Sequence, residues 1–196
     1  MLEIHRTFRT GFAESPSLVR GVRNGDSRHA EVVATQLNLL SVALHAHHGG
    51  EDEGLWPRLE ARAPACRLHV ERMKVQHAEM LKWLDHLDAA LPAWRVSGTA
   101  REAEPVLAAL DGINASLAEH LGDEETNIVP VMEQVITEAE VKWYSKEGQR
   151  STPRGQMWNM LGMVMGAQPD GGAEFMRREL PRRFGCCGDL LASGSM

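Results

Sequence analysis

Two stretches of the sequence, HHGGEDEGLWPRL at residues 47–59 and HLGDEETNIVPVM at residues 120–132, align with each other without a gap. Each begins with a histidine, which is followed by a glycine, a glutamate, a further acidic residue, an aliphatic residue and a proline at the same offsets. An isolated His-x-x-x-Glu motif occurs easily by chance, but a motif repeated in matching context does not. The two stretches are therefore an internal repeat.

The repeat carries two pairs of side chains that can bind a metal. His47 precedes Glu51 by four residues, and His120 precedes Glu124 by the same interval. Residues four apart lie about 6 Å from each other on one face of an α-helix. Each pair can thus present an imidazole nitrogen and a carboxylate oxygen to one point. The alternative is that both pairs lie on solvent-exposed helix faces. The row of apolar residues along each helix would then have to stop at the same place in both helices.

The periodicity of the sequence predicts an all-α protein. Apolar residues recur at steps of three and four in four long segments, and alternating β-branched runs are absent. We expect an up-down four-helix bundle over residues 1–135 and additional C-terminal helices over residues 136–184 that pack on it. Residues 185–196 are rich in Gly and Ser, which predicts a loose tail.

Capping residues and prolines predict where these helices begin and end. Asp26 is expected to cap the second helix and Thr137 the first helix of the extension. The Ser15-Pro16 pair predicts a break in the first helix, and Pro92 predicts the end of the third.

Composition narrows the class of protein. The formal net charge of -6 argues against nucleic acid as a partner, and no apolar run is long enough to span a membrane. The chain contains 3 cysteines, an odd number that fits a reducing compartment, and its start lacks a signal peptide. We therefore expect a cytoplasmic protein, a monomer or weak oligomer.

The other two helices of the bundle each place a histidine on the apolar stripe. These are His5 and His77. Buried carboxylates and imidazoles are costly unless they find partners, and a metal centre supplies partners for all of them. The alternative is that His5 and His77 are ordinary half-buried histidines. We interpret the six residues as a dinuclear site.

The types of ligand also indicate which metal the site would bind. Imidazoles and carboxylates without thiolate suit iron better than structural zinc. Two six-coordinate ions need about twelve donor atoms, more than the six residues supply. The remaining positions can bind a small diatomic or peroxide ligand, such as O2, NO or H2O2.

The order His5, His47-x-x-x-Glu51, His77, His120-x-x-x-Glu124 resembles the hemerythrin-like, or HHE cation-binding, family over about residues 1–135. The resemblance implies a four-helix bundle with two iron ions joined by an oxo or hydroxo bridge. Its family members carry oxygen, sense oxygen, NO or iron, or react with peroxide and nitric oxide.

Within the family the chain resembles the bacterial type. Oxygen-carrying hemerythrins have a further histidine where this chain has Met73, and an aspartate one residue beyond the position of Glu124. Both departures count against simple oxygen carriage. An iron ion with one protein ligand fewer favours reaction with a bound molecule over its reversible binding.

Two further residues are candidate ligands. His48 lies about 100° round the helix from His47, which favours a surface or supporting position, yet it is the best replacement for the missing imidazole. Tyr144 can supply a phenolate to ferric iron, although packing beside Trp143 with its hydroxyl in water is the favoured interpretation. Four acidic residues are interpreted as outer-face acids or as partners that orient imidazoles, namely Asp52, Glu53, Asp123 and Glu125.

We expect a redox-active di-iron protein that detoxifies peroxide, or nitric oxide together with peroxide, using an electron donor that the sequence does not name. A sensor of O2, NO or iron, which signals through the docking of the C-terminal helices, is the first alternative. Iron storage is the second. The short extension has no effector motif, and this favours chemistry over sensing.

Overall fold

The computed structural model describes residues 1–179, and it confirms an all-α protein. The expected end of the last helix near Phe184, the tail and Cys186 and Cys187 lie outside the described residues. The elements are α1 (Leu2–Gly21), α2 (Ser27–Gly50), the π-helical turn η1 (Glu51–Leu55), α3 (Trp56–Arg62), the 3-10 turn η2 (Pro64–Cys66), α4 (Arg67–Ser97), α5 (Ala100–Asn127), α6 (Val129–Val135), α7 (Glu138–Ser151), α8 (Met157–Gly166) and α9 (Ala173–Glu179).

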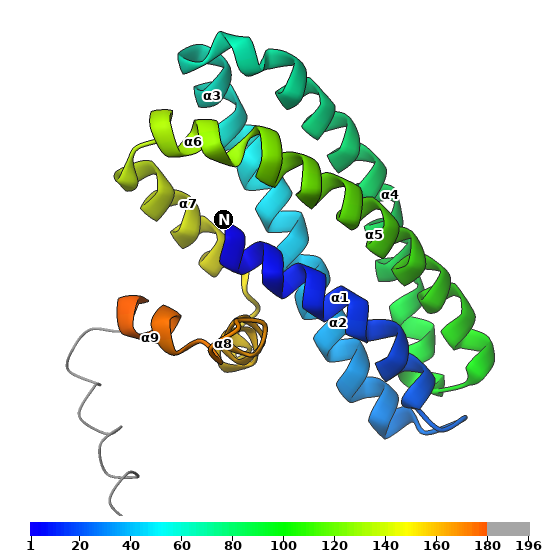
Figure 1. Cartoon of the computed structure of the whole chain (residues 1–196). Coiled ribbons are helices and arrows are strands. Elements are labelled where there is room, and N and C mark those ends of the chain that lie inside the picture. Colours follow the sequence, from blue (N-terminus) through cyan, green and yellow to red (C-terminus); the bar gives the residue numbers. More distant parts are fainter. Residues whose placement is uncertain (180–196) are drawn as a thin grey trace, which may run out of the picture.

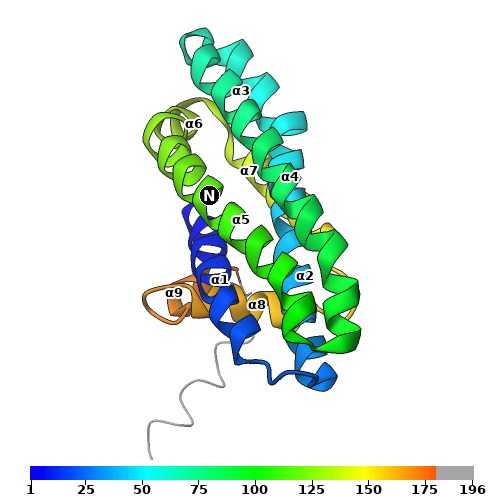
Figure 2. The same cartoon turned by 90° about the vertical axis from the view of Figure 1, so that its right-hand side faces the viewer.

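The four long helices α1, α2, α4 and α5 form the bundle (Figures 1 and 2). Helix α4 packs on α2 and α5, and α1 packs on the same two helices from the other side. The short helices α3 and α6 lie at one end. At the other end the backbone N–H of Gly25 donates to the carbonyl of Gly98 at 2.9 Å, which ties two connecting loops together. In the extension, α7 packs on α2 and α8 packs on α1.

The two expected N-caps are confirmed. The carboxylate of Asp26 accepts a hydrogen bond from the backbone N–H of His29 at 3.0 Å. Thr137 forms a capping box with Glu140, in which each side chain accepts from the other residue's backbone N–H. Such a box satisfies two of the free N–H groups at a helix start. It sets where α7 begins, and therefore which of its residues reach the bundle.

The expected break at Ser15-Pro16 is wrong, because α1 continues through Pro16. A proline inside a helix leaves the carbonyl four residues earlier without its usual donor. Here that carbonyl belongs to Phe12, and it accepts a hydrogen bond from the side chain of Asn114 on α5 at 3.0 Å. A neighbouring helix thus replaces the lost backbone bond.

The expected end of the third helix at Pro92 is also wrong, because α4 continues to Ser97. Pro92 faces solvent, where water can satisfy the carbonyl that its ring deprives of a donor. The next turn of α4 buries the large side chain of Trp94 in the core. Burial of such a side chain stabilises by a few kcal/mol, which offsets the cost of the proline.

The interior consists of two apolar clusters with a polar layer between them. The larger cluster includes Phe8, Leu44 and Met80, and the smaller one includes Leu55 and Met73. Along α2 and η1, the buried side chains between Leu44 and Leu55 are polar, namely those of His47, His48 and Glu51. The polar layer is therefore enclosed by apolar packing along the bundle axis.

No helix among residues 1–179 is long and apolar enough to cross a membrane.

Candidate metal centre

Seven titratable side chains from the four bundle helices meet in the polar layer. All are buried: His5, His47, His48, Glu51, His77, His120 and Glu124. The structure thus brings together all six residues of the predicted site, and it adds His48. Their role as ligands stays a prediction, and the geometry below supports it.

Helix geometry explains how α2 and the adjoining turn η1 contribute three of these side chains. Successive residues are about 100° apart around a helix, so Glu51 lies roughly 40° from His47 and 60° from His48, between the two. His47 faces α1, where it meets His5, and the ring of His48 stacks on His77 of α4 at 4.0 Å between centroids. Glu51 opens the π-helical turn η1, a wider turn that is often found at functional sites.

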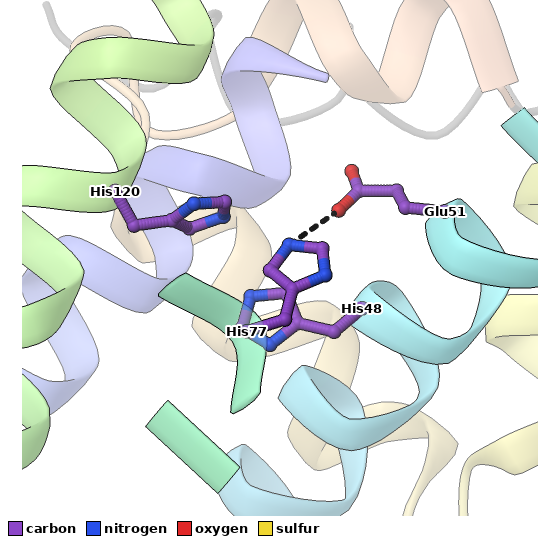
Figure 3. A group of neighbouring side chains, drawn as sticks. All are labelled: His48, Glu51, His77 and His120. Atoms are coloured by element: carbon purple, nitrogen blue, oxygen red, sulfur yellow. Dashed lines mark ion pairs between the residues drawn. The ribbon is translucent and has the colours of Figure 1, made fainter. Parts of the chain in front are cut away.

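Two groups of ligand atoms share Glu51. One comprises His48, Glu51, His77 and His120 (Figure 3), and within it the atoms lie within 4.8 Å of one another. The second group, with the same spacing, comprises His5, His47, Glu51 and Glu124. Oε1 of Glu51 lies 3.3 Å from Nε2 of His47, and Oε2 lies 3.4 Å from Nε2 of His77. One carboxylate oxygen thus faces each group.

Glu124 also lies between the two groups. Its Oε2 is 3.3 Å from Nε2 of His5 and 3.6 Å from Nε2 of His120. Two ligands bound at right angles with bonds of about 2.1 Å lie about 3 Å apart. The separations in the structure are close to this value, so neighbouring atoms can share an ion.

The buried polar atoms also indicate that a cation fits. Among the described residues, Nε2 of His48, His77 and His120 and all four carboxylate oxygens of Glu51 and Glu124 have no hydrogen-bond partner. A buried polar atom without a partner costs about 1–3 kcal/mol, and more if it is charged. A metal bound by these nitrogen and oxygen atoms would remove that cost.

A second layer of side chains orients three of the imidazoles. Nδ1 of His77 lies 3.0 Å from Oδ1 of Asp52, and Nδ1 of His5 lies 3.0 Å from Oε1 of Glu125. Nδ1 of His120 lies 3.2 Å from Oε1 of Gln76. Carboxylate and amide oxygens can only accept, so Nδ1 carries the proton and donates in each case. The lone pair of Nε2 then points into the centre, as metal ligation requires.

His47 is oriented from outside the bundle by Tyr144 of α7. The hydroxyl of Tyr144 lies 2.5 Å from Nδ1 of His47 and donates to the carbonyl of the same residue at 2.9 Å. The interpretation of this hydroxyl as solvent-facing is therefore wrong, because α7 folds back onto α2. A Cβ added at Gly50 would lie 2.6 Å from the Tyr144 ring, so the glycine makes room for it. Ligation by Tyr144 stays a prediction.

Burial changes the protonation of the centre. It lowers the pKa of His5 to about 4 and that of His120 to about 3, so both imidazoles are neutral at pH 7. Burial raises the pKa of Glu124 to about 8, and burial together with the charge of Glu124 raises the pKa of Glu51. Neutral imidazoles bind metals, whereas the two carboxyl groups need a cation nearby in order to ionise.

A sequence profile described as the Hemerythrin HHE cation binding domain matches residues 1–132 of the chain. The chain belongs to the hemerythrin HHE family. Its bundle is accordingly a cation-binding domain, and the resemblance found in the sequence is confirmed. The hemerythrin match ends within α6, so α7 and Tyr144 lie beyond the part shared with the family. Comparison with curated proteins and with solved structures found no match.

Sequence reasoning identified some of the orienting residues of this hemerythrin-family site and missed others. Of the four acids expected either to face outward or to orient imidazoles, Asp52 and Glu125 each contact an imidazole. Glu53 is exposed, and Asp123 pairs with Arg72 instead. Gln76 was missed, because a glutamine next to a seam histidine gives no signal in the sequence. The interpretation of His48 as a surface residue is wrong, because His48 is buried. It lies about 100° round the helix from His47, and this direction faces α4, where its ring stacks on His77.

Proposed function

We propose that the chain is a non-heme di-iron protein of the cytoplasm that detoxifies peroxide, or nitric oxide together with peroxide. The observation that carries this proposal is the position of Glu51, which presents one oxygen to each of two groups of ligand atoms. Such a carboxylate is suited to hold two ions side by side. The absence of cysteine from both groups favours iron over structural zinc.

The donor atoms support a centre that reacts with small molecules. The two groups together contain five imidazoles and two carboxylates, and each carboxylate has at most two oxygens to offer. This is fewer than the roughly twelve donors of two octahedral ions. The positions that the protein does not fill are open to peroxide or nitric oxide.

The reaction of nitric oxide with peroxide needs no separate reductant. Each of two nitric oxide molecules gives up one electron, peroxide takes up both, and two molecules of nitrous acid result. Two iron ions, when bound, would supply the one-electron steps of this exchange. Reduction of peroxide alone would require an external electron donor.

The residues around the centre have defined roles in this proposal. Asp52 and Glu125 accept the Nδ1 protons of His77 and His5, which holds both imidazoles in the ligating tautomer. The apolar clusters on either side keep bulk water from reaching the centre along the bundle axis. Exclusion of water strengthens the electrostatic interactions inside the site.

A sensor is the second candidate function, and Tyr144 favours it. The Tyr144 hydroxyl connects His47 to α7, a helix that has no fully buried residue of its own. The remaining attachment of α7 includes exposed ion pairs of Glu140 with Arg58 and Arg62. A change at His47 could therefore alter how α7 is docked and signal to a partner.

Stopped-flow spectroscopy tests the proposal and separates it from the sensor. The anaerobically reduced protein would be mixed with H2O2, with NO, with both together and with O2. We expect repeated turnover when peroxide and nitric oxide are mixed in together, or when peroxide is supplied with an added electron donor, whereas peroxide alone should give a single turnover. One stable adduct without turnover would instead support a sensor. Metal analysis that gives zinc, or one metal per chain, would refute the di-iron assignment itself.

A further inference from the structure

A cavity of about 350 Å³ lies in the seam between α2 and α4. Its inner wall is formed by the buried residues His48, His77 and Leu84. Its outer part is lined by exposed residues, among them Lys74 and Leu81, whose exposures are 42% for the side chain and 45% respectively. The cavity thus leads from the surface to two imidazoles of the candidate centre.

The inner end of the cavity belongs to the group of ligand atoms drawn in Figure 3. There the rings of His48 and His77 stack on each other, with His120 on one side of the pair and Glu51 on the other. Nε2 of His48 and Nε2 of His77 are both buried and have no hydrogen-bond partner among the described residues. A molecule that fills the cavity would therefore meet the edge of the ligand group.

The other seams of the bundle are covered at the level of the centre. Between α1 and α5, Glu125 bridges His5 and Arg9 with contacts of 3.0 and 2.9 Å. Between α4 and α5, Gln76 connects His120 to Asp123.

Beside His47, the ring and hydroxyl of Tyr144 from α7 cover α2. Trp143 lies next to it over Gly54. On the α2–α4 side, the cavity adjoins His48 and His77, and its lining includes Asp52, which accepts from Nδ1 of His77 at 3.0 Å.

We propose that this cavity is the route by which small oxidants such as peroxide and nitric oxide reach the centre. This inference rests on the proposed function, and it names the path and the size class of the substrate. A molecule of liquid water occupies about 30 Å³, so a cavity of this volume admits a peroxide-sized molecule together with several waters.

Two glycines at equivalent positions of the internal repeat provide a matched test. Gly49 lines the cavity, whereas Gly122, its counterpart on α5, does not. A Cβ added at either position meets nothing within 4 Å. Leucine is a better helix former than glycine by roughly 0.8–1 kcal/mol, so both Gly49→Leu and Gly122→Leu are expected to fold. Only the Gly49→Leu side chain would obstruct the cavity.

The first measurement is the binding of azide to the iron-loaded protein, followed by its charge-transfer absorption in a stopped-flow instrument. We expect Gly49→Leu to slow both association and dissociation by about tenfold, so that the Kd changes little, as for a gated site. Gly122→Leu should match the wild type. Ala78→Leu, on the α4 wall of the cavity, is a second obstruction and should slow binding as well. Wild-type rates in both Gly49→Leu and Ala78→Leu would overturn the proposal.

A second measurement uses the metal-free protein, so that it is independent of the reaction. Diethyl pyrocarbonate acylates accessible imidazoles, and mass spectrometry locates the modified residues. His48 should react in the wild type and in Gly122→Leu, and react about tenfold more slowly in Gly49→Leu. His77 should be protected in all three proteins, because its Nε2 is buried and its Nδ1 donates to Asp52. Equal reactivity of His48 in all three proteins would refute the route. Suppose that Gly49→Leu protects His48 from acylation, but that the iron-loaded wild type binds no azide and turns over no oxidant. The cavity would then be confirmed as a route, and the proposed function would be refuted.

Discussion

The neighbouring glycines Gly49 and Gly50 should respond in opposite ways to the same substitution. In Gly49→Ala the new Cβ meets nothing within 4 Å, and alanine is favoured over glycine in a helix by about 1 kcal/mol. This variant should therefore be more stable than the wild type by up to about 1 kcal/mol.

Gly50→Ala gains the same helix propensity but collides with Tyr144. The new Cβ would lie 2.6 Å from Cε2 and 3.1 Å from Cδ2 of the ring, whereas carbon atoms pack at about 3.5–4.0 Å. The ring must move by about 1 Å, which weakens the hydroxyl contacts with His47, each worth about 0.5–1.5 kcal/mol. Overpacking of this kind costs about 1–3 kcal/mol. We expect a net loss of about 1–2 kcal/mol after the gain in propensity.

Thermal unfolding of the two variants at matched metal content measures the difference. A gap of about 2–3 kcal/mol corresponds to roughly 4–12 °C in Tm for a chain of this size. The Tyr144→Ala background provides the control, because there the collision is removed and Gly50→Ala should become stabilising. If Gly50→Ala remains destabilising without the tyrosine ring, or if both glycine variants melt together, the reasoning is refuted.

The remaining predictions concern the metals and the groups around them. Glu51→Ala should lose both ions, because this carboxylate faces both ligand groups, whereas His5→Ala should lose one preferentially; equal metal content by mass spectrometry would contradict this. Removal of the metal should lower Tm by several degrees, since a bound ion stabilises only the folded state, and calorimetry of the two forms checks it. In the metal-free protein, stability measured relative to Glu124→Gln should fall by about 1–2 kcal/mol from pH 6.5 to 8, because the raised pKa of Glu124 keeps on the folded chain a proton that the unfolded chain has already lost and that is released as the pH approaches about 8, while the buried histidines contribute equally to both proteins. Denaturant titrations should show no such fall in the loaded protein. The contacts of the Tyr144 hydroxyl with His47 predict superimposable visible spectra for oxidised wild type and Tyr144→Phe, and a phenolate band lost in the variant would instead show ligation.

The sequence by itself determined the fold class and six of the seven residues that meet in the polar layer, all except His48. Helical periodicity and the internal repeat are local patterns, and they place His47 and Glu51 on the buried stripe of α2 irrespective of what packs against it. His120 and Glu124 follow from the same pattern on α5. Capping is local as well, which is why the positions of Asp26 and Thr137 as caps were predicted correctly.

The tertiary structure decided the features that depend on a neighbouring helix. Pro16 remains inside α1 because the side chain of Asn114, far away in the sequence, donates to the carbonyl that the proline leaves free. His48 lies off the apolar stripe of α2. It is buried only because α4 packs against the side of α2 from which His48 projects. Tyr144 reaches His47 because α7 folds back onto α2, and no periodicity within α7 encodes where the bundle lies. Local sequence sets which way a side chain points on its helix, whereas packing between helices decides what it meets there.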